Sequence, residues 1–259
     1  MTSRIVLITD THLTPAGKRY HNTDPWAIFS TALERIVELR PSAVVHLGDI
    51  ASRPGSAEVY RTFLHTVEES GRRCPWHLVP GNHDDVLAME SVFPLRPGNG
   101  IVLHRTVSSV TLGGIRIVFV PDGCAVTAAV RRAFRHPQPL LAVTHRHLYP
   151  VGVDWIDSTI HPHRTGLLQL LSDRKRAGRA SIVAYGHVHR WQTFDAGGAP
   201  SRDSRAAVVS LDSLSTRFDM EADSWAVSEP APSVALVEYV PETGTFTTTR
   251  IALSVPHRV

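Results

Sequence analysis

The sequence IVLITDTH at residues 5–12 decides how the rest of the chain is interpreted. Its first half, Ile5 to Ile8, is a short apolar run of the kind that forms a buried strand. Asp10 and His12 follow at a spacing of two, and in an extended chain residues two apart point to the same side. Because ligands bind where the strands of open α/β sheets end, this pair predicts a binding site. An ordinary polar loop with a capping Asp would have the same sequence.

Polar side chains follow four later apolar runs in the same way. The five strand ends together supply seven nitrogen or oxygen donors: Asp10, His12, Asp49, Asn82, His145, His187 and His189. Asp49 alone would be an ordinary helix cap and Asn82 an ordinary turn residue, so the recurrence carries the inference. No Cys is among the donors, which fits Mn, Fe, Co or Zn.

Seven donors exceed what one metal ion with an open coordination position would use. Two ions that share a bridging carboxylate fit better, because such a pair activates a water and clamps the attacking and leaving oxygens at phosphorus. With two divalent ions and two ligand carboxylates, Asp10 and Asp49, the site would be positively charged. We therefore expect an anionic phosphoester as the substrate and hydrolysis as the reaction.

The order of the elements favours an α/β fold. Short apolar runs alternate with helical periodicity, which is typical of βαβ units and predicts strands at 5–9, 43–47, 76–79, 115–120, 140–144 and 181–185. Thr23-Asp24-Pro25 predicts the start of a helix, and a second helix is expected from near Ser56 to Ser70-Gly71. Gly113-Gly114 predicts a hairpin that joins 107–112 to 115–120.

The C-terminal part has a different pattern from about residue 190. Strands are expected at 206–211, 234–240 and 245–253, and residues 215–233 form a polar, Pro-containing segment that predicts a loop. The strands of this part and of the first part together indicate two sheets packed face to face.

Composition excludes several classes of protein. The 259 residues are 42% hydrophobic and 20% charged, as in globular proteins and unlike disordered ones. There is no apolar stretch of the ~18 to 20 residues that a membrane span needs, and no signal-peptide pattern after Met1, so we expect a cytoplasmic protein. The net charge of +3 comes from scattered residues and does not indicate a nucleic-acid surface. Cys74 and Cys124 are expected to be buried thiols.

Five motifs, D-x-H, G-D, G-N-H-D, a strand-end His and G-H-x-H, occur in this order between Asp10 and His189. In this combination the sequence resembles the calcineurin-like metallophosphoesterase superfamily. The resemblance implies an α/β fold with a two-sheet β-sandwich flanked by helices, the four-layer αββα metallophosphoesterase fold. It also implies that residues 1–259 are a single domain of this kind.

The resemblance assigns a role to each motif residue. It implies one metal ion on Asp10, His12 and His189, a second on Asn82, His145 and His187, and Asp49 as the bridge between them. The ions would be divalent Mn, Fe or Zn, with Mn or an Fe/Mn pair favoured. His83 stays outside the metal ions in this family and assists the leaving group, so it is the candidate catalytic acid or transition-state donor. Asp84 would orient His83 or cap a helix.

Two shorter segments, ITDTHL at 8–13 and GVDWID at 152–157, resemble class III cyclic nucleotide phosphodiesterases and their glycerophosphodiester-cleaving relatives. Those enzymes typically carry H-H-P-P at the fourth motif, where this chain has HRHL. His145 is the expected ligand, with His147 as the alternative. Arg146 is a candidate substrate-binding residue, because a guanidinium can pair with phosphate oxygens, or else an ordinary surface residue.

The expected function is that of a metal-dependent phosphodiesterase that hydrolyses a cyclic nucleotide or another small phosphodiester by attack of a metal-bridging hydroxide. The alternative is a phosphomonoesterase or nucleotide pyrophosphatase with the same dinuclear site. A metal-free scaffold would lack ligands that are present here. The expected partner is a small phosphoester, with no membrane or nucleic acid, and the C-terminal hairpin could pair across a homodimer.

Overall fold

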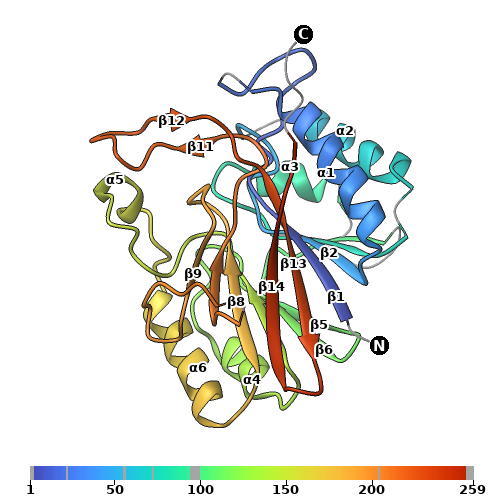
Figure 1. The fold of residues 1–259 in the computed structure, drawn as a ribbon. Helices are drawn as coiled ribbons and strands as arrows, with labels where there is room; N and C mark the ends of the chain where they lie inside the picture. The colour runs from blue at the N-terminus through green and yellow to red at the C-terminus, as the bar shows by residue number, and fades with distance from the viewer. Residues whose placement is uncertain are drawn as a thin grey trace.

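The structure is a computed structural model that describes residues 3–21, 23–54, 57–71, 73–93, 100–203 and 205–254. Two six-stranded sheets pack face to face, and helices cover their outer faces (Figure 1). This arrangement confirms the expected two-sheet sandwich with flanking helices. Within the described ranges, the helices are too short or too polar to cross a membrane.

The first sheet is mostly parallel, with an antiparallel hairpin added at one edge. Its strands in spatial order are β14 (Thr245–Ala252), β13 (Ser233–Val240), β1 (Ser3–Ile8), β2 (Ala43–His46), β3 (Trp76–Leu78) and β4 (Ile101–Leu103). Strands β1 to β4 run parallel, whereas β13 pairs antiparallel with both β1 and β14. The C-terminal hairpin therefore extends the sheet that the N-terminus begins.

The second sheet contains the remaining long strands. Their spatial order is β5 (Ser108–Leu112), β6 (Ile115–Phe119), β7 (Leu140–Val143), β8 (Ser181–Tyr185), β10 (Val208–Ser210) and β9 (Gln192–Phe194). Strands β6, β7, β8 and β10 run parallel, and β5 and β9 are antiparallel edges. A separate pair of two-residue strands, β11 (Arg217–Phe218) and β12 (Val227–Ser228), forms a small third sheet.

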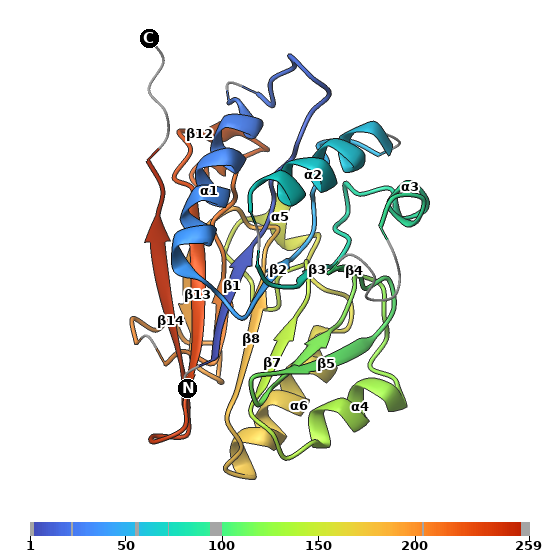
Figure 2. The same cartoon turned by 90° about the vertical axis from the view of Figure 1, so that its right-hand side faces the viewer.

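Three hydrophobic clusters hold the four layers together. The middle cluster lies between the two sheets, and the outer two lie under the helices on each side. Figure 2 shows the helices on both outer faces, with α4 and α6 against the second sheet. The helices are α1 (Pro25–Leu39), α2 (Ala57–Glu69), α3 (Val86–Glu90), α4 (Ala128–Arg135), α5 (Asp154–Asp157) and α6 (Arg164–Arg176).

The predicted elements are present, with strand ends shifted by no more than two residues. Asp24 caps α1 by accepting from the amides of the first turn, and Pro25 is its first residue, as predicted. The second helix is α2, and Ser56, where it was expected to begin, lies outside the described residues.

Two expectations are corrected by the structure. Residues 215–233 are not only a loop, because Arg217 and Phe218 pair with Ser228 and Val227 to form the β11–β12 hairpin. Two-residue strands in a polar segment leave no periodicity to detect. Cys74 and Cys124 are half-buried rather than buried, because each packs at the rim of an outer hydrophobic cluster.

Candidate metal centre

Six buried side chains form two groups at the carboxyl ends of strands from both sheets. The first group is Asp10, His12 and His189, and the second is Asp49, His145 and His187. Within each group the potential ligand atoms lie within 4.8 Å of one another. Strands β1 and β2 of the first sheet lead into the loops that carry three of these residues, and β7 and β8 of the second sheet lead into the other three. The candidate metal centre therefore spans both sheets.

The backbone at these strand ends is left-handed, which residues other than glycine rarely adopt. Five residues share this conformation, with φ between 42° and 67°: Asp10, His12, Asp49, His187 and His189. Such strain costs on the order of 1 kcal/mol per residue and concentrates at functional sites. These turns send His187 and His189 to different groups, although residues two apart in an extended chain would point to the same side.

Two motif glycines allow the loops after β2 and β3 to approach each other closely. Gly48 has a φ of 106°, and a Cβ on it would lie 2.7 Å from the Cα of Gly81 and from Nδ1 of His145. A Cβ on Gly81 would collide with the carboxylate of Asp49. Any larger residue at either position would therefore displace candidate ligands.

The first group brings ring nitrogens and a carboxylate oxygen into close contact. Nδ1 of His189 donates to the Thr216 carbonyl at 2.9 Å, so Nε2 of the neutral ring carries a lone pair. This Nε2 lies 3.1 Å from Nε2 of His12 and 3.3 Å from Oδ1 of Asp10. Oδ1 of Asp10 is buried and accepts no hydrogen bond from the described part of the chain. A cation among these atoms would satisfy all of them, so the residues fit a metal ion.

The second group has the same property. Nδ1 of His145 donates to the Leu47 carbonyl at 2.9 Å. Its Nε2 lies 3.4 Å from Oδ2 of Asp49 and 3.1 Å from Oδ1 of Asn82, both of which are acceptors. Asn82 thus contacts this group through His145. His147, the alternative to His145, lies outside both groups and stacks on His187 with ring centroids 5.6 Å apart.

The Asp49 carboxylate lies between the two groups. Its Oδ2 is 3.6 Å from Nε2 of His12 in the first group and 3.4 Å from Nε2 of His145 in the second. Its Oδ1 accepts the backbone N–H of His83 at 2.8 Å. Asp49 thus contacts residues of both groups.

A hydrogen bond from outside the group orients His187. The Thr159 hydroxyl lies 2.7 Å from Nε2 of His187 and donates its own proton to the Ile156 carbonyl. The His187 ring must therefore donate from Nε2, which leaves the lone pair on Nδ1.

Burial and the mutual attraction of these groups set their charges. Burial opposes ionisation of Asp49, yet His145 holds the pKa of Asp49 below its usual range. Burial also opposes charge on His145, but Asp49 raises the pKa of His145 to about 10. Burial lowers the pKa of His12 to about 3. A proton on His145 thus offsets buried negative charge, and a divalent ion could take over that role.

His83 lies beside the two groups and is a member of neither. Its Nδ1 donates to the Ser52 carbonyl at 3.2 Å, and its ring meets that of His12 edge-on with centroids 5.0 Å apart. His83 also lines the cavity described below. These contacts hold the His83 ring in the lining of that cavity.

Asp84 connects loops rather than capping a helix. Its carboxylate accepts the backbone amides of residues 50, 51 and 81 and the hydroxyl of Tyr60. The residue that caps α3 is Asp85. The helix-cap alternative for Asp84 is therefore wrong, because its oxygens hold the loops after β2 and β3 together.

Arg146 donates from Nε to Asp122 at 3.0 Å and from Nη1 to the Thr159 carbonyl at 2.9 Å. The same Thr159 orients His187. This guanidinium is therefore linked to His187 of the second group through Thr159. Its expected contact with substrate stays a prediction.

The segment after β10 contributes residues that the sequence motifs do not mark. The hydroxyls of Ser213 and Ser215 donate to the Asp10 carbonyl at 2.8 and 2.9 Å. Phe218 stacks on His189, with ring centroids 4.0 Å apart and planes 9° from parallel. The two serines lie more than two hundred residues from Asp10 in the sequence. No local sequence pattern therefore predicts these contacts.

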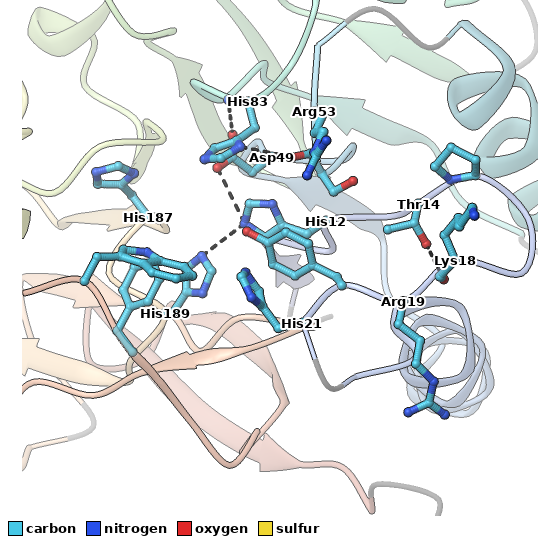
Figure 3. Close-up of a pocket in the computed structure, with 15 residues that line it drawn as sticks. His12, Thr14, Lys18, Arg19, His21, Asp49, Arg53, His83, His187 and His189 are labelled. Atoms are coloured by element: carbon cyan, nitrogen blue, oxygen red, sulfur yellow. Dashed lines mark hydrogen bonds and ion pairs between the residues drawn. The ribbon is translucent and has the colours of Figure 1, made fainter.

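A cavity of about 690 Å³ opens over the two groups. Figure 3 shows His12, Asp49, His83, His187 and His189 close together in its lining. The cavity is large enough for a small ligand of nucleotide size.

Comparison with known proteins agrees with this geometry. The family model for calcineurin-like phosphoesterases matches residues 3–191. A relative from Rhodopseudomonas palustris, named "Probable cyclic nucleotide phosphodiesterase", is 26% identical over 203 residues, 72% of each chain. A relative from Arcobacter nitrofigilis, named "Probable glycerophosphodiester phosphodiesterase", is 26% identical over 277 residues, covering 95% of this chain and 92% of the relative.

Solved structures share the fold at low sequence identity. A purple acid phosphatase from yellow lupin seeds matches with a TM-score of 0.68 at 15% identity. The match covers 92% of this chain but 49% of the lupin one, so this chain spans about half of that protein. A dimetal phosphatase from Danio rerio matches with a TM-score of 0.54 at 14% identity, over 97% of this chain and 99% of the other.

Proposed function

The chain belongs to the calcineurin-like phosphoesterase family and is a metallophosphoesterase, and on that premise we propose that it hydrolyses a small phosphodiester, either a cyclic nucleotide or a glycerophosphodiester. The observation that carries the proposal is the convergence of buried carboxylate and imidazole side chains in two groups that meet at Asp49 beside one cavity. Curated relatives of both substrate classes match the chain at the same identity.

In this proposal Asp10, His12 and His189 hold one divalent ion, Asn82, His145 and His187 hold a second, and Asp49 contacts both. The two ions would supply Lewis acidity and an activated water for attack at phosphorus. Divalent Mn, Fe or Zn is the proposed content, because the donors are nitrogen and oxygen only, and the family resemblance favours Mn or an Fe/Mn pair.

The side chains themselves position the substrate and move a proton. The backbone bonds of His145 and His189 fix which ring nitrogen carries the lone pair, so neither ring can turn away from the site. His83, held by Ser52, donates a proton or hydrogen bond to the leaving oxygen. The whole chain is proposed to act as one catalytic domain, because residues 213 and 215 close over the Asp10 loop.

The test is hydrolysis by the Mn-loaded protein of a matched panel: cyclic AMP in its 3′,5′ and 2′,3′ forms, a glycerophosphodiester, a phosphomonoester and a nucleotide pyrophosphate. Asp49→Asn is the inactive control, and Asp173→Asn, an exposed change on α6, is the neutral one. The proposal expects diesters to have the highest kcat/KM and Asp49→Asn to abolish it. A preference for the monoester or the pyrophosphate would overturn the proposal and leave the metal centre in place.

A further inference from the structure

The mouth of the cavity carries an exposed tryptophan. Among the described residues, Val37, Leu87 and Trp225 are the large hydrophobic side chains that are exposed, and Trp225 is the one that lines this cavity. Half of its surface, 50%, is open to solvent. An indole that is half exposed and lines a cavity presents an apolar face on which a ring of a bound ligand can stack.

A row of rings connects this tryptophan to the metal centre. Tyr20 stacks on His12, with ring centroids 4.5 Å apart and planes 6° from parallel. His21 meets Tyr20 edge-on at 4.4 Å, and Trp225 lies 4.9 Å from His21 at a tilt of 46°. The tilt leaves the indole only partly covered by His21. Figure 3 shows His21 beside His189 in the lining of the same cavity.

Two different segments build this wall. Tyr20 and His21 come from the loop after β1, and Trp225 comes from the connection of the β11–β12 hairpin, whose Phe218 stacks on His189. His21 has a left-handed backbone with a φ of 51°, a conformation that persists only when its surroundings hold it. The loop after β1 therefore holds one end of the row of rings, and the β11–β12 connection holds the other.

From this placement we infer that Trp225, positioned by His21, is the surface on which the substrate's nucleobase stacks. The inference rests on the proposed function and deepens it, since it favours a cyclic nucleotide over a glycerophosphodiester. A phosphoester beside His12 and a ring on Trp225 are separated by two intervening side chains. The ring must therefore be joined to phosphorus through a spacer, as a nucleobase is through its sugar. A glycerol diester has no ring to place there.

Stacking of a base on an aromatic side chain contributes about 1–3 kcal/mol, measured by substitution to alanine. We therefore expect Trp225→Ala to raise KM for cyclic AMP about tenfold and to change kcat less than about twofold. The KM for a glycerophosphodiester should not change. Trp225→Phe should recover most of the loss, and Leu87→Ala, an exposed apolar change outside this cavity, should have no effect.

A binding measurement separates this inference from the proposed function. Calorimetric titration with adenosine 5′-monophosphate needs no turnover, and its Kd should rise about tenfold in Trp225→Ala. If the protein cleaves diesters but Trp225→Ala alters neither this Kd nor the KM for cyclic AMP, the inference is wrong and the proposed function stands. An equal loss with the glycerol diester would also overturn the inference. If the protein cleaves no diester but binds the nucleotide through Trp225, only the proposed function fails.

Discussion

His83 is placed to act on the leaving oxygen without holding a metal ion. We expect His83→Gln to lower kcat by about 10²- to 10⁴-fold, the usual contribution of a positioned acid. Metal content should stay at the wild-type value, because the His83 side chain bonds to the Ser52 carbonyl and belongs to neither group. Turnover assays paired with elemental analysis check both statements.

The leaving group provides the control for this prediction. A nitrophenolate leaves without protonation, so a nitrophenyl diester should recover much of the His83→Gln loss. Loss of bound metal in the variant, or an equal loss with good and poor leaving groups, would contradict the role given to His83.

Thr159 is the residue whose hydroxyl fixes the His187 ring. Thr159→Val keeps the shape of the side chain and removes this hydrogen bond, and such changes typically weaken metal binding by about 10- to 100-fold. Competition titration of Mn²⁺ with a chelator measures the change. Thr62→Val, at an exposed position on α2, is the matched control, and unaltered Mn²⁺ affinity in Thr159→Val would refute the prediction.

Candidate ligands could be predicted from the sequence, whereas their partners could not. His145 and His187 stand in short motifs at strand ends, where residue type and spacing carry the information. Thr159 and Thr216 contact ligands 28 and 27 residues away in the chain, through loops that have no motif. Only the folded backbone brings such pairs together.

At the scale of elements, the strand positions followed from apolar runs because buried parallel strands are apolar on both faces. The left-handed turns after β1, β2 and β8 did not follow, because Asp and His at these positions are not the glycines that usually mark such turns. The β11–β12 hairpin was missed for a related reason, since four paired residues form no periodic pattern.

A histidine pair outside the metal centre links three elements and makes the fold sensitive to acid. Nδ1 of His77 on β3 lies 2.9 Å from Nε2 of His104, whose ring stacks on Phe119 of β6. Burial lowers the pKa of His77 to about 4, and burial with the charge of His77 lowers the pKa of His104 to about 3. Both rings are therefore neutral in the folded protein at pH 5 to 7.

At pH values between these lowered pKa values and the ordinary histidine pKa of 6.5, the unfolded chain binds more protons than the folded one. The stability that depends on these two neutral rings is therefore fully present above pH 6.5, and it is lost as the pH falls toward 4. His104→Leu should reduce this loss by on the order of 1 kcal/mol. Urea unfolding of chelated protein from pH 7 to 4 measures it. His65→Gln, at an exposed position, should follow the wild type, and an unchanged pH slope in His104→Leu would count against the prediction.

At the scale of the whole molecule, the candidate centre is the place where loops from both sheets supply side chains to one site. Loops after β1 and β2 supply Asp10, His12 and Asp49, and loops after β7 and β8 supply the other three side chains. The sequence indicated this meeting point because carboxyl ends of parallel strands lie on one edge. The family resemblance also implied that His187 and His189 belong to different groups, whereas their spacing alone did not, because the left-handed turns at these positions decide where each ring points.

Removal of metal should therefore destabilise the whole fold. A ligand that binds the native state at a concentration 100 times its Kd stabilises it by about 2.7 kcal/mol. In a domain of this size each kcal/mol moves the melting temperature by about 2–4 °C, so chelation should lower the Tm by about 5–10 °C. Without metal ions, the buried carboxylates of Asp10 and Asp49 also lose the charge that compensates them.

Calorimetric scans of the Mn-loaded and chelated protein, with metal content measured in parallel, test this expectation. Asp49→Asn, which removes the carboxylate shared by both groups, should bind less metal and respond weakly to the chelator, because it has little metal left to lose. Asp173→Asn should respond as the wild type does, since that side chain lies exposed on α6. A wild-type Tm that is unchanged after all metal is removed would mean that the two sheets hold their positions without the ions, and that the ions act only in the chemistry.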